Sequence, residues 1–253
     1  MRPLLTVAGL LGLWQLLVLL TGVPKYILPS PLQVALALVE HRALLLEHMG
    51  VTLLEIVAGL LLGALLGIAT ALQMAWLPRL QRWLMPLLVV SQTIPVFALA
   101  PILMLWLGFG IASKIAMTVL IIYFPVTAAC YDGLRSTRRG WIDLAQSMGA
   151  GRLAELRYVR LPAALPALAS GLRVATCVAP IGAVVGEWVG SSSGLGFLML
   201  HANGRMMVDL MFAALFVLCA SAVALYFFVD RLLLRALAWQ PETLTVNSKG
   251  RVR

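Results

Sequence analysis

The stretch Asp143-Leu-Ala-Gln-Ser-Met-Gly149, followed at fixed spacing by Val159, Leu161 and Pro162, is a polar island inside an otherwise apolar chain. Of the 253 residues, 62% are hydrophobic and only 11% are charged, and the mean hydropathy is +0.98. A soluble domain usually carries about 25% charged residues. The composition therefore indicates an all-α integral membrane protein, in which the polar island is a loop between two membrane segments.

Apolar runs long enough to cross the hydrocarbon as a helix recur along the chain. They occupy residues 4–22, 51–76, 83–107, 111–134, 163–188 and 207–234. Because backbone amides that face lipid must be bonded within their own segment, runs of this length are expected to be helices. We therefore predict six transmembrane helices.

Three regions are expected along the chain. Residues 1–50 should hold the first transmembrane helix and an external amphipathic helix that starts at Ser30 and Pro31, which are favourable at a helix N-terminus. Residues 51–237 should form a core of five transmembrane helices with a loop at 135–162. Residues 238–253 are polar and without periodicity, and a disordered tail is expected there.

The positions of the basic residues predict the orientation. In a soluble protein, a net charge of +9 would suggest a nucleic-acid partner. In a membrane protein, the positions of Lys and Arg instead indicate which loops are cytoplasmic, and no nucleic-acid partner is expected. If Arg2 is cytoplasmic, 14 of the 19 basic residues lie on the cytoplasmic side. The opposite loops hold Lys25, Arg42, Lys114 and Arg205, and Arg173 lies inside the fifth span. Both termini are therefore expected in the cytoplasm of a multi-pass inner-membrane protein.

No pattern of catalytic residues accompanies this topology. The sequence contains no ATP-binding Walker A motif, nucleophile elbow, HExxH pattern or paired carboxylates, and its cysteines lack metal-ligand spacing. We expect no catalytic residues, no metal and no cofactor bound by this chain. If such a membrane protein is a transporter, it lacks an ATP site and would have to be driven either by another subunit or by an ion gradient. A gradient-driven transporter would need a relay of buried acids, yet Glu55 is the only ionisable residue well inside spans two to four.

The polar island predicts two short helices around a turn at Gly149, where glycine adopts backbone angles that other residues resist. Ala145 and Ala150 would let a partner surface approach closely. Pro162 begins the next span, so movement of the loop would pass directly into the fifth helix.

This loop resembles the cytoplasmic EAA loop of ABC importer permeases, with Asp143 in place of the usual glutamate and Leu144 in place of an alanine. Further segments resemble the permeases for nitrate, sulfonates, taurine and pyrimidine precursors. These segments are Thr93-Ile-Pro-Val-Phe-Ala-Leu-Ala-Pro101, Leu105-Trp-Leu-Gly-Phe-Gly110, Gly186-Glu-Trp188 and Ser193-Gly-Leu-Gly196. The resemblance implies the type I ABC importer permease fold and a transport subunit that is not an enzyme.

The resemblance also implies partners and roles. It implies a second copy of this chain, two ATP-binding subunits that carry ATP and Mg, an external solute-binding protein, and membrane lipid around the spans. The residues expected to couple to the ATP-binding subunits are Asp143, Ala145, Gly149, Ala150, Val159, Leu161 and Pro162. The solute is expected to be small and polar, and overall similarity favours a pyrimidine or thiamine precursor, with sulfonate, taurine or nitrate as the alternative.

The third span is a candidate wall of the solute pathway. Pro86, Pro95 and Pro101 each remove an amide donor, and polar Ser91, Gln92 and Thr93 lie near the middle. Simple kinks filled by neighbouring helices would explain the same pattern.

Two ionisable residues of the fifth span also need partners or a role. Glu187 at its outer end is either a further pathway residue or a structural contact to the following loop. Arg173, nearer the cytoplasmic end, is expected to reach the interface or to pair with Asp143 or Glu155.

Overall fold

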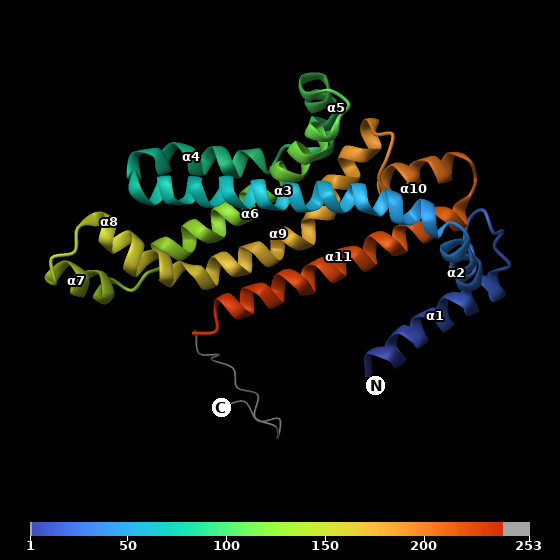
Figure 1. Ribbon diagram of the computed structural model, residues 1–253, viewed down its shortest axis with the longest axis horizontal. Coiled ribbons are helices and arrows are strands. Elements are labelled where there is room, and N and C mark those ends of the chain that lie inside the picture. The colour runs from blue at the N-terminus through green and yellow to red at the C-terminus, as the bar shows by residue number, and fades with distance from the viewer. Residues whose placement is uncertain (1, 240–253) are drawn as a thin grey trace.

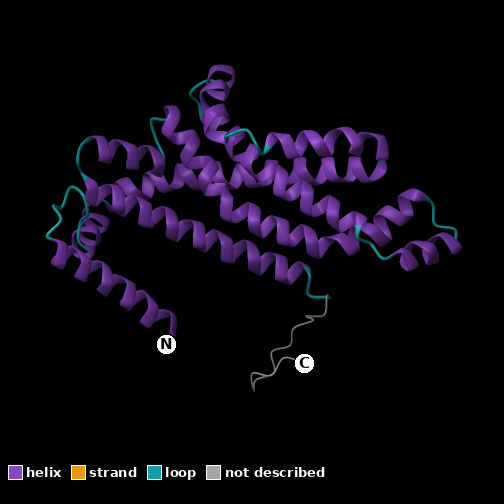
Figure 2. Cartoon of the chain, turned by 180° about the vertical axis from the view of Figure 1, so that it is seen from behind, coloured by secondary structure: helices purple, strands orange, loops and turns teal. Residues whose placement is uncertain are grey.

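The computed structural model describes residues 2–239, and every regular element within that range is a helix (Figures 1 and 2). In order these are α1 (Arg2–Thr21), α2 (Pro31–Glu40), α3 (Arg42–Trp76), α4 (Pro78–Ser91), α5 (Val96–Leu107), α6 (Ile111–Arg135), α7 (Arg139–Ser147), α8 (Arg152–Glu155), a π-helical turn (Leu156–Arg160), α9 (Leu161–Gly190), α10 (Leu195–Gly204) and α11 (Val208–Ala236).

The centre of the fold is α6, which packs along both α3 and α9. On α3, Gly59, Gly63 and Gly67 recur every four residues, and all three face α6. A Cβ added at Gly63 would lie 3.1 Å from the side chain of Ile122. Small residues at such contacts let helix backbones approach closely where burial from water supplies no driving force.

One long helix connects the two ends of the molecule. The helical path from Arg152 through the π-helical turn to Gly190 is 39 residues long. In Figure 1, α7 and α8 lie at one end of the molecule, and α2 and α10 lie at the other. The predicted loop is thus physically continuous with α9, as the position of Pro162 suggested.

The number of membrane spans differs from the prediction. Four helices are long and apolar enough to cross a membrane, namely α3, α6, the α8–α9 helix and α11, and the bent pair α4–α5 could make a fifth. The first predicted span falls in α1, whose stretch Gly9–Thr21 counts only as a shorter apolar helix. The count of six therefore stays a prediction.

The external helix expected from Ser30 and Pro31 is short. It begins as expected, because Ser30 accepts a hydrogen bond from the Gln33 amide and Gln33 bonds back in a capping box. However, it ends at Glu40, and residues from Arg42 onward belong to α3. His48 of α3 is buried, and its Nδ1 accepts a hydrogen bond from the amide of Gly194.

The third predicted span is broken. Helix α4 runs back beside α3 (Figure 1). Helix α5 is bent away from α4 by 103°. The break falls at Gln92–Pro95, whereas Pro86 and Pro101 are accommodated inside their helices. Pro95 precedes the first residue of α5, where the missing amide hydrogen costs no helical bond.

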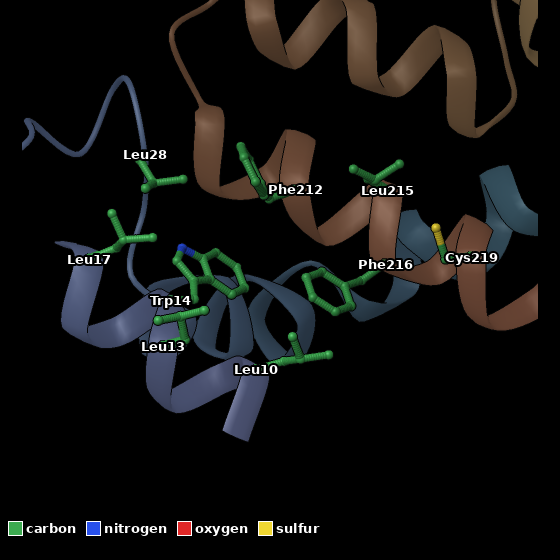
Figure 3. Close-up of a pocket in the computed structure, with 9 residues that line it drawn as sticks. All are labelled: Leu10, Leu13, Trp14, Leu17, Leu28, Phe212, Leu215, Phe216 and Cys219. Carbon is green, nitrogen blue, oxygen red and sulfur yellow. The ribbon is translucent and has the colours of Figure 1, made fainter. Parts of the chain in front are cut away.

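Helix α1 attaches to α11 through aromatic stacking. The Trp14 ring lies 6.0 Å from that of Phe216 and 5.9 Å from that of Phe212, between centroids. Figure 3 shows these rings at an apolar cavity of about 480 Å³ between the two helices. The remaining residues that line it are Leu10, Leu13, Leu17, Leu28, Leu215 and Cys219.

Arg173 has a different partner from those predicted. Its Nε donates to Asp230 Oδ1 of α11 at 2.6 Å, so the expectation of Asp143 or Glu155 was wrong. The pair joins α9 to α11, because both side chains lie in spans where an unpaired charge would be costly. The predicted tail, apart from residues 238 and 239, lies outside the described residues.

The close approach of α6 to α9 gives a stability prediction. A Cβ at Gly182 would lie 2.6 Å from the Cα of Thr118, a backbone atom that cannot rotate away. We expect Gly182→Ala to lower the free energy of unfolding by about 1–3 kcal/mol through overpacking, measured by denaturant titration in detergent micelles. Gly50→Ala is the matched control, since nothing lies within 4 Å of its added Cβ. Equal stability of the two variants would contradict the packing shown here.

Candidate functional site

The turn between α7 and α8 requires glycine at position 149. Gly149 has a φ of +81°, in the left-handed region that side chains resist. Its amide donates to the carbonyl of Gln146, and the amide of Ala150 donates to the carbonyl of Ala145, both at 2.9 Å. These two bonds form a Schellman motif, which ends α7 and satisfies its last carbonyls.

Glu155 braces the two short helices against each other. Its Oε2 accepts a hydrogen bond from Gln146 Nε2 at 3.1 Å, and its Oε1 lies 3.3 Å from Arg160 Nε. The first contact ties α7 to α8, and the second ties α8 to the start of α9. The loop is therefore held in one arrangement by its own side chains.

A group of large apolar side chains is exposed on this loop. We call them the loop surface, and they are Trp141, Leu144, Met148, Leu153 and Tyr158, with exposed fractions between 51% and 79%. An apolar patch of this kind on a polar loop is typical of a protein interface. Next to it lies a cavity of about 710 Å³. Its lining residues are Arg138, Trp141, Leu144, Ala145, Met148, Tyr158, Val159, Pro162, Ala163, Pro166 and Trp239.

Of the seven predicted coupling residues, the structure brings Ala145, Val159 and Pro162 together around this cavity. Asp143 is exposed on α7, Gly149 and Ala150 form the turn, and Leu161 begins α9. Sequence reasoning missed Trp141, Met148 and Tyr158. The signal that could have found them is the presence of large apolar residues in a segment otherwise polar enough to stay in water.

The predicted pathway residues lie in two different environments. Ser91, Gln92 and Thr93 are exposed at the break between α4 and α5. The hydroxyls of Ser91 and Thr93 donate to the carbonyls of Leu88 and Val90, both at 2.7 Å. The exposed break thus presents neutral groups.

Glu187, in contrast, is 1% exposed and belongs to a network that we call the outer polar cluster, formed by His48, Thr52, Glu55, Lys114 and Glu187. The hydroxyl of Thr52 donates to Glu187 Oε1 at 2.7 Å. The amides of Gly196 and Phe197 donate to Glu187 Oε2 at 2.5 and 3.3 Å. The carboxylate therefore caps the N-terminus of α10, where the helix dipole favours a negative charge.

Lys114 completes the outer polar cluster from α6. Its Nζ lies 3.3 Å from Glu55 Oε1 and 2.5 Å from Ser191 Oγ, and its side chain is 6% exposed. The sequence placed Lys114 in an outer loop because it stands near the start of a span. Because Lys114 is buried, it does not count among the basic residues whose positions indicate how the chain is oriented in the membrane.

Neither of these polar regions coincides with the cavity between α1 and α11. That cavity is lined by leucine, phenylalanine and tryptophan side chains with one cysteine (Figure 3). A polar solute would find few hydrogen-bond partners there, so we assign these residues to helix packing. Within residues 2–239, no group of three or more acidic, histidine or cysteine side chains is arranged to hold a metal ion.

Several proteins with known assignments are similar over almost the whole chain. A probable ABC transporter permease protein of Haemophilus influenzae is 59% identical over 93% of this chain and 96% of its own length. The formylaminopyrimidine transport permease ThiX of Halalkalibacterium halodurans is 42% identical, covering 86% and 87%. The riboflavin transport system permease RibX of Chloroflexus aurantiacus is 38% identical, covering 91% and 88%. These relatives are transport components rather than enzymes.

Solved structures share the fold. An amino acid ABC transporter superimposes with a TM-score of 0.64 at 15% identity, over 81% of this chain and 98% of that one. Residues 59–237 match the family described as the binding-protein-dependent transport system inner membrane component. The chain therefore belongs to this family, and it is an inner-membrane permease subunit of an ABC importer, a kind of subunit that works with ATPase and solute-binding partners.

Proposed function

We propose that this permease imports a small polar solute containing a pyrimidine-type ring, of the kind that serves as a thiamine precursor. The observation that carries the proposal is the pair of relatives at 42% and 38% identity, whose names give formylaminopyrimidine and riboflavin as cargo. Both solutes contain a pyrimidine-type ring with neutral hydrogen-bonding groups. Permeases for aliphatic sulfonates and taurine are less similar, at 30% identity.

The proposed pathway runs past the break between α4 and α5. Ser91, Gln92 and Thr93 offer hydroxyl and amide groups, which suit an uncharged heterocycle better than a sulfonate anion. Glu187 remains a proposed pathway residue at the outer end of α9, although in this conformation its carboxylate is engaged by Thr52 and α10. Selectivity would be shared with the external solute-binding protein.

The proposed assembly places two ATP-binding subunits on the loop surfaces of two copies of this chain. Both termini would lie in the cytoplasm, and ATP and Mg would be bound by the partner subunits alone. Closure of those subunits would move α7 and α8, and the continuous helix from Arg152 to Gly190 would carry the movement across the membrane. The coupling residues are the seven predicted from the sequence together with Trp141, Met148 and Tyr158.

The turn at Gly149 supplies a test of this coupling. Proline fixes φ near −65° and has no amide hydrogen, so Gly149→Pro would lose both the turn conformation and the bond to Gln146, at a cost of about 3 kcal/mol. We expect the variant complex to keep basal ATPase activity in proteoliposomes but to lose transport and its stimulation by the solute-binding protein. Gly151→Ala is the control, because its φ is −71° and its added Cβ meets nothing within 4 Å.

Two outcomes would count against this coupling model. Transport at the wild-type rate by an assembled Gly149→Pro complex would show that the loop does not couple. Transport by the purified chain alone with a proton gradient would show that a gradient drives it instead.

The cargo can be tested in the same proteoliposomes with the cognate binding protein and ATPase. We expect ATP-dependent uptake of radiolabelled formylaminopyrimidine or hydroxymethylpyrimidine, competed by the unlabelled compound and not by excess taurine. The reason is that a site built to hydrogen-bond a heterocycle leaves polar groups unpaired when an alkyl sulfonate replaces it. Uptake of taurine with no uptake of either pyrimidine would overturn the cargo assignment.

A further inference from the structure

The outer polar cluster contains more acidic than basic groups. Glu55 of α3, Lys114 of α6 and Glu187 of α9 are 0%, 5% and 1% exposed. If all three were ionised, two negative charges would face one positive charge away from water. Buried charge without a partner is avoided in proteins, because burial removes the water that would stabilise it.

His48 cannot supply the missing positive charge. It packs into the same cluster from α3, and its Nδ1 accepts a hydrogen bond from the amide of Gly194 at 2.9 Å. A cationic imidazole carries hydrogens on both nitrogens and could not accept this bond. His48 is therefore neutral here, and the charge balance of the cluster depends on Glu55, Lys114 and Glu187.

The hydrogen-bond donors in the cluster are shared unequally between the two carboxyl groups. Glu187 receives the Thr52 hydroxyl and the amides of Gly196 and Phe197, and it faces the N-terminus of α10. Glu55 lies 3.3 Å from Lys114 at one oxygen, and neither of its oxygens accepts a hydrogen bond from the described residues. Lys114 directs its short bond, at 2.5 Å, to Ser191 instead.

We propose that Glu55 carries a proton, so that the outer polar cluster is a proton-binding site holding one neutral carboxylic acid, one carboxylate at Glu187 and one ammonium group at Lys114. The bound proton makes the formal charges balance. It also removes the repulsion between the neighbouring Glu55 and Glu187 carboxyl groups. Glu187 is then the positioning residue that fixes α10, and Glu55 is its neutral neighbour.

The proposal predicts that two identical substitutions have unequal effects. Glu55→Gln replaces a neutral acid by a neutral amide of the same shape, and we expect its thermal unfolding midpoint in lipid nanodiscs to stay within about 2 °C of wild type. Glu187→Gln removes a carboxylate that accepts three hydrogen bonds, and we expect a midpoint lower by roughly 5–10 °C. A Glu55→Gln variant that melts as low as Glu187→Gln would overturn the proposal.

A second measurement locates the proton directly. Infrared spectra of the full-length chain should contain the C=O stretch of a protonated carboxyl group that shifts in D₂O. This band should vanish in Glu55→Gln and remain in Lys114→Met, which removes the cation that would favour an ionised Glu55. Persistence of the band in Glu55→Gln, or its loss only in Glu187→Gln, would place the proton elsewhere.

A double-mutant cycle keeps the proposal testable if one variant folds poorly. If Glu55 is neutral, Lys114→Met lowers the midpoint by the same amount in wild type and in the Glu55→Gln background. If Glu55 is an ionised partner of Lys114, Glu55→Gln relieves most of that loss, which would contradict the proposal. None of these measurements involves transport, so their failure would leave the importer assignment untouched.

Discussion

The close approach of α6 to both α3 and α9 is the contact on which the rest of the structure depends. Inside a membrane, burying apolar side chains against one another gains little over contact with lipid, so helices associate through tight packing and polar bonds. Gly63 of α3 and Gly182 of α9 both provide tight packing against α6. Lys114 provides the polar contacts, because its Nζ donates to Ser191 at the end of α9 and lies 3.3 Å from Glu55 Oε1 of α3. The three helices therefore form one block.

This block connects two regions that lie far apart. At a rise of about 1.5 Å per residue, the 39-residue helix from Arg152 to Gly190 spans roughly 58 Å. One end carries the loop surface, and the other carries Glu187 with α10 attached to it. The π-helical turn Leu156–Arg160 falls at the junction of loop and span, and such turns are frequent at functional sites. The helix is thus continuous from the loop surface to Glu187. The Arg173–Asp230 ion pair joins it to α11.

Much of this arrangement could be predicted from local sequence, because its causes are local. The glycine repeat of α3, the turn at Gly149 and the capping box at Ser30 each depend on residues a few positions apart. The pairs Glu55–Lys114 and Arg173–Asp230 could not be predicted, because each joins side chains of different helices and depends on how the helices rotate against each other. The burial of His48 could not be predicted for the same reason. A polar residue near the end of a span is expected to face water. Only the folded structure shows that the distant amide of Gly194 donates a hydrogen bond to His48.

These buried pairs also bear on what the solute can meet. The ionisable side chains in the interiors of α3, α6, α9 and α11, namely Glu55, Lys114, Arg173, Glu187 and Asp230, all make contacts between elements of the fold. The α4–α5 break exposes Ser91, Gln92 and Thr93, which are uncharged. A fully charged solute passing this break would lose water without gaining a counter-charge, whereas an uncharged heterocycle can exchange water for amide and hydroxyl groups. On the proposed pathway, the uncharged groups of the break thus favour an uncharged solute over an anion.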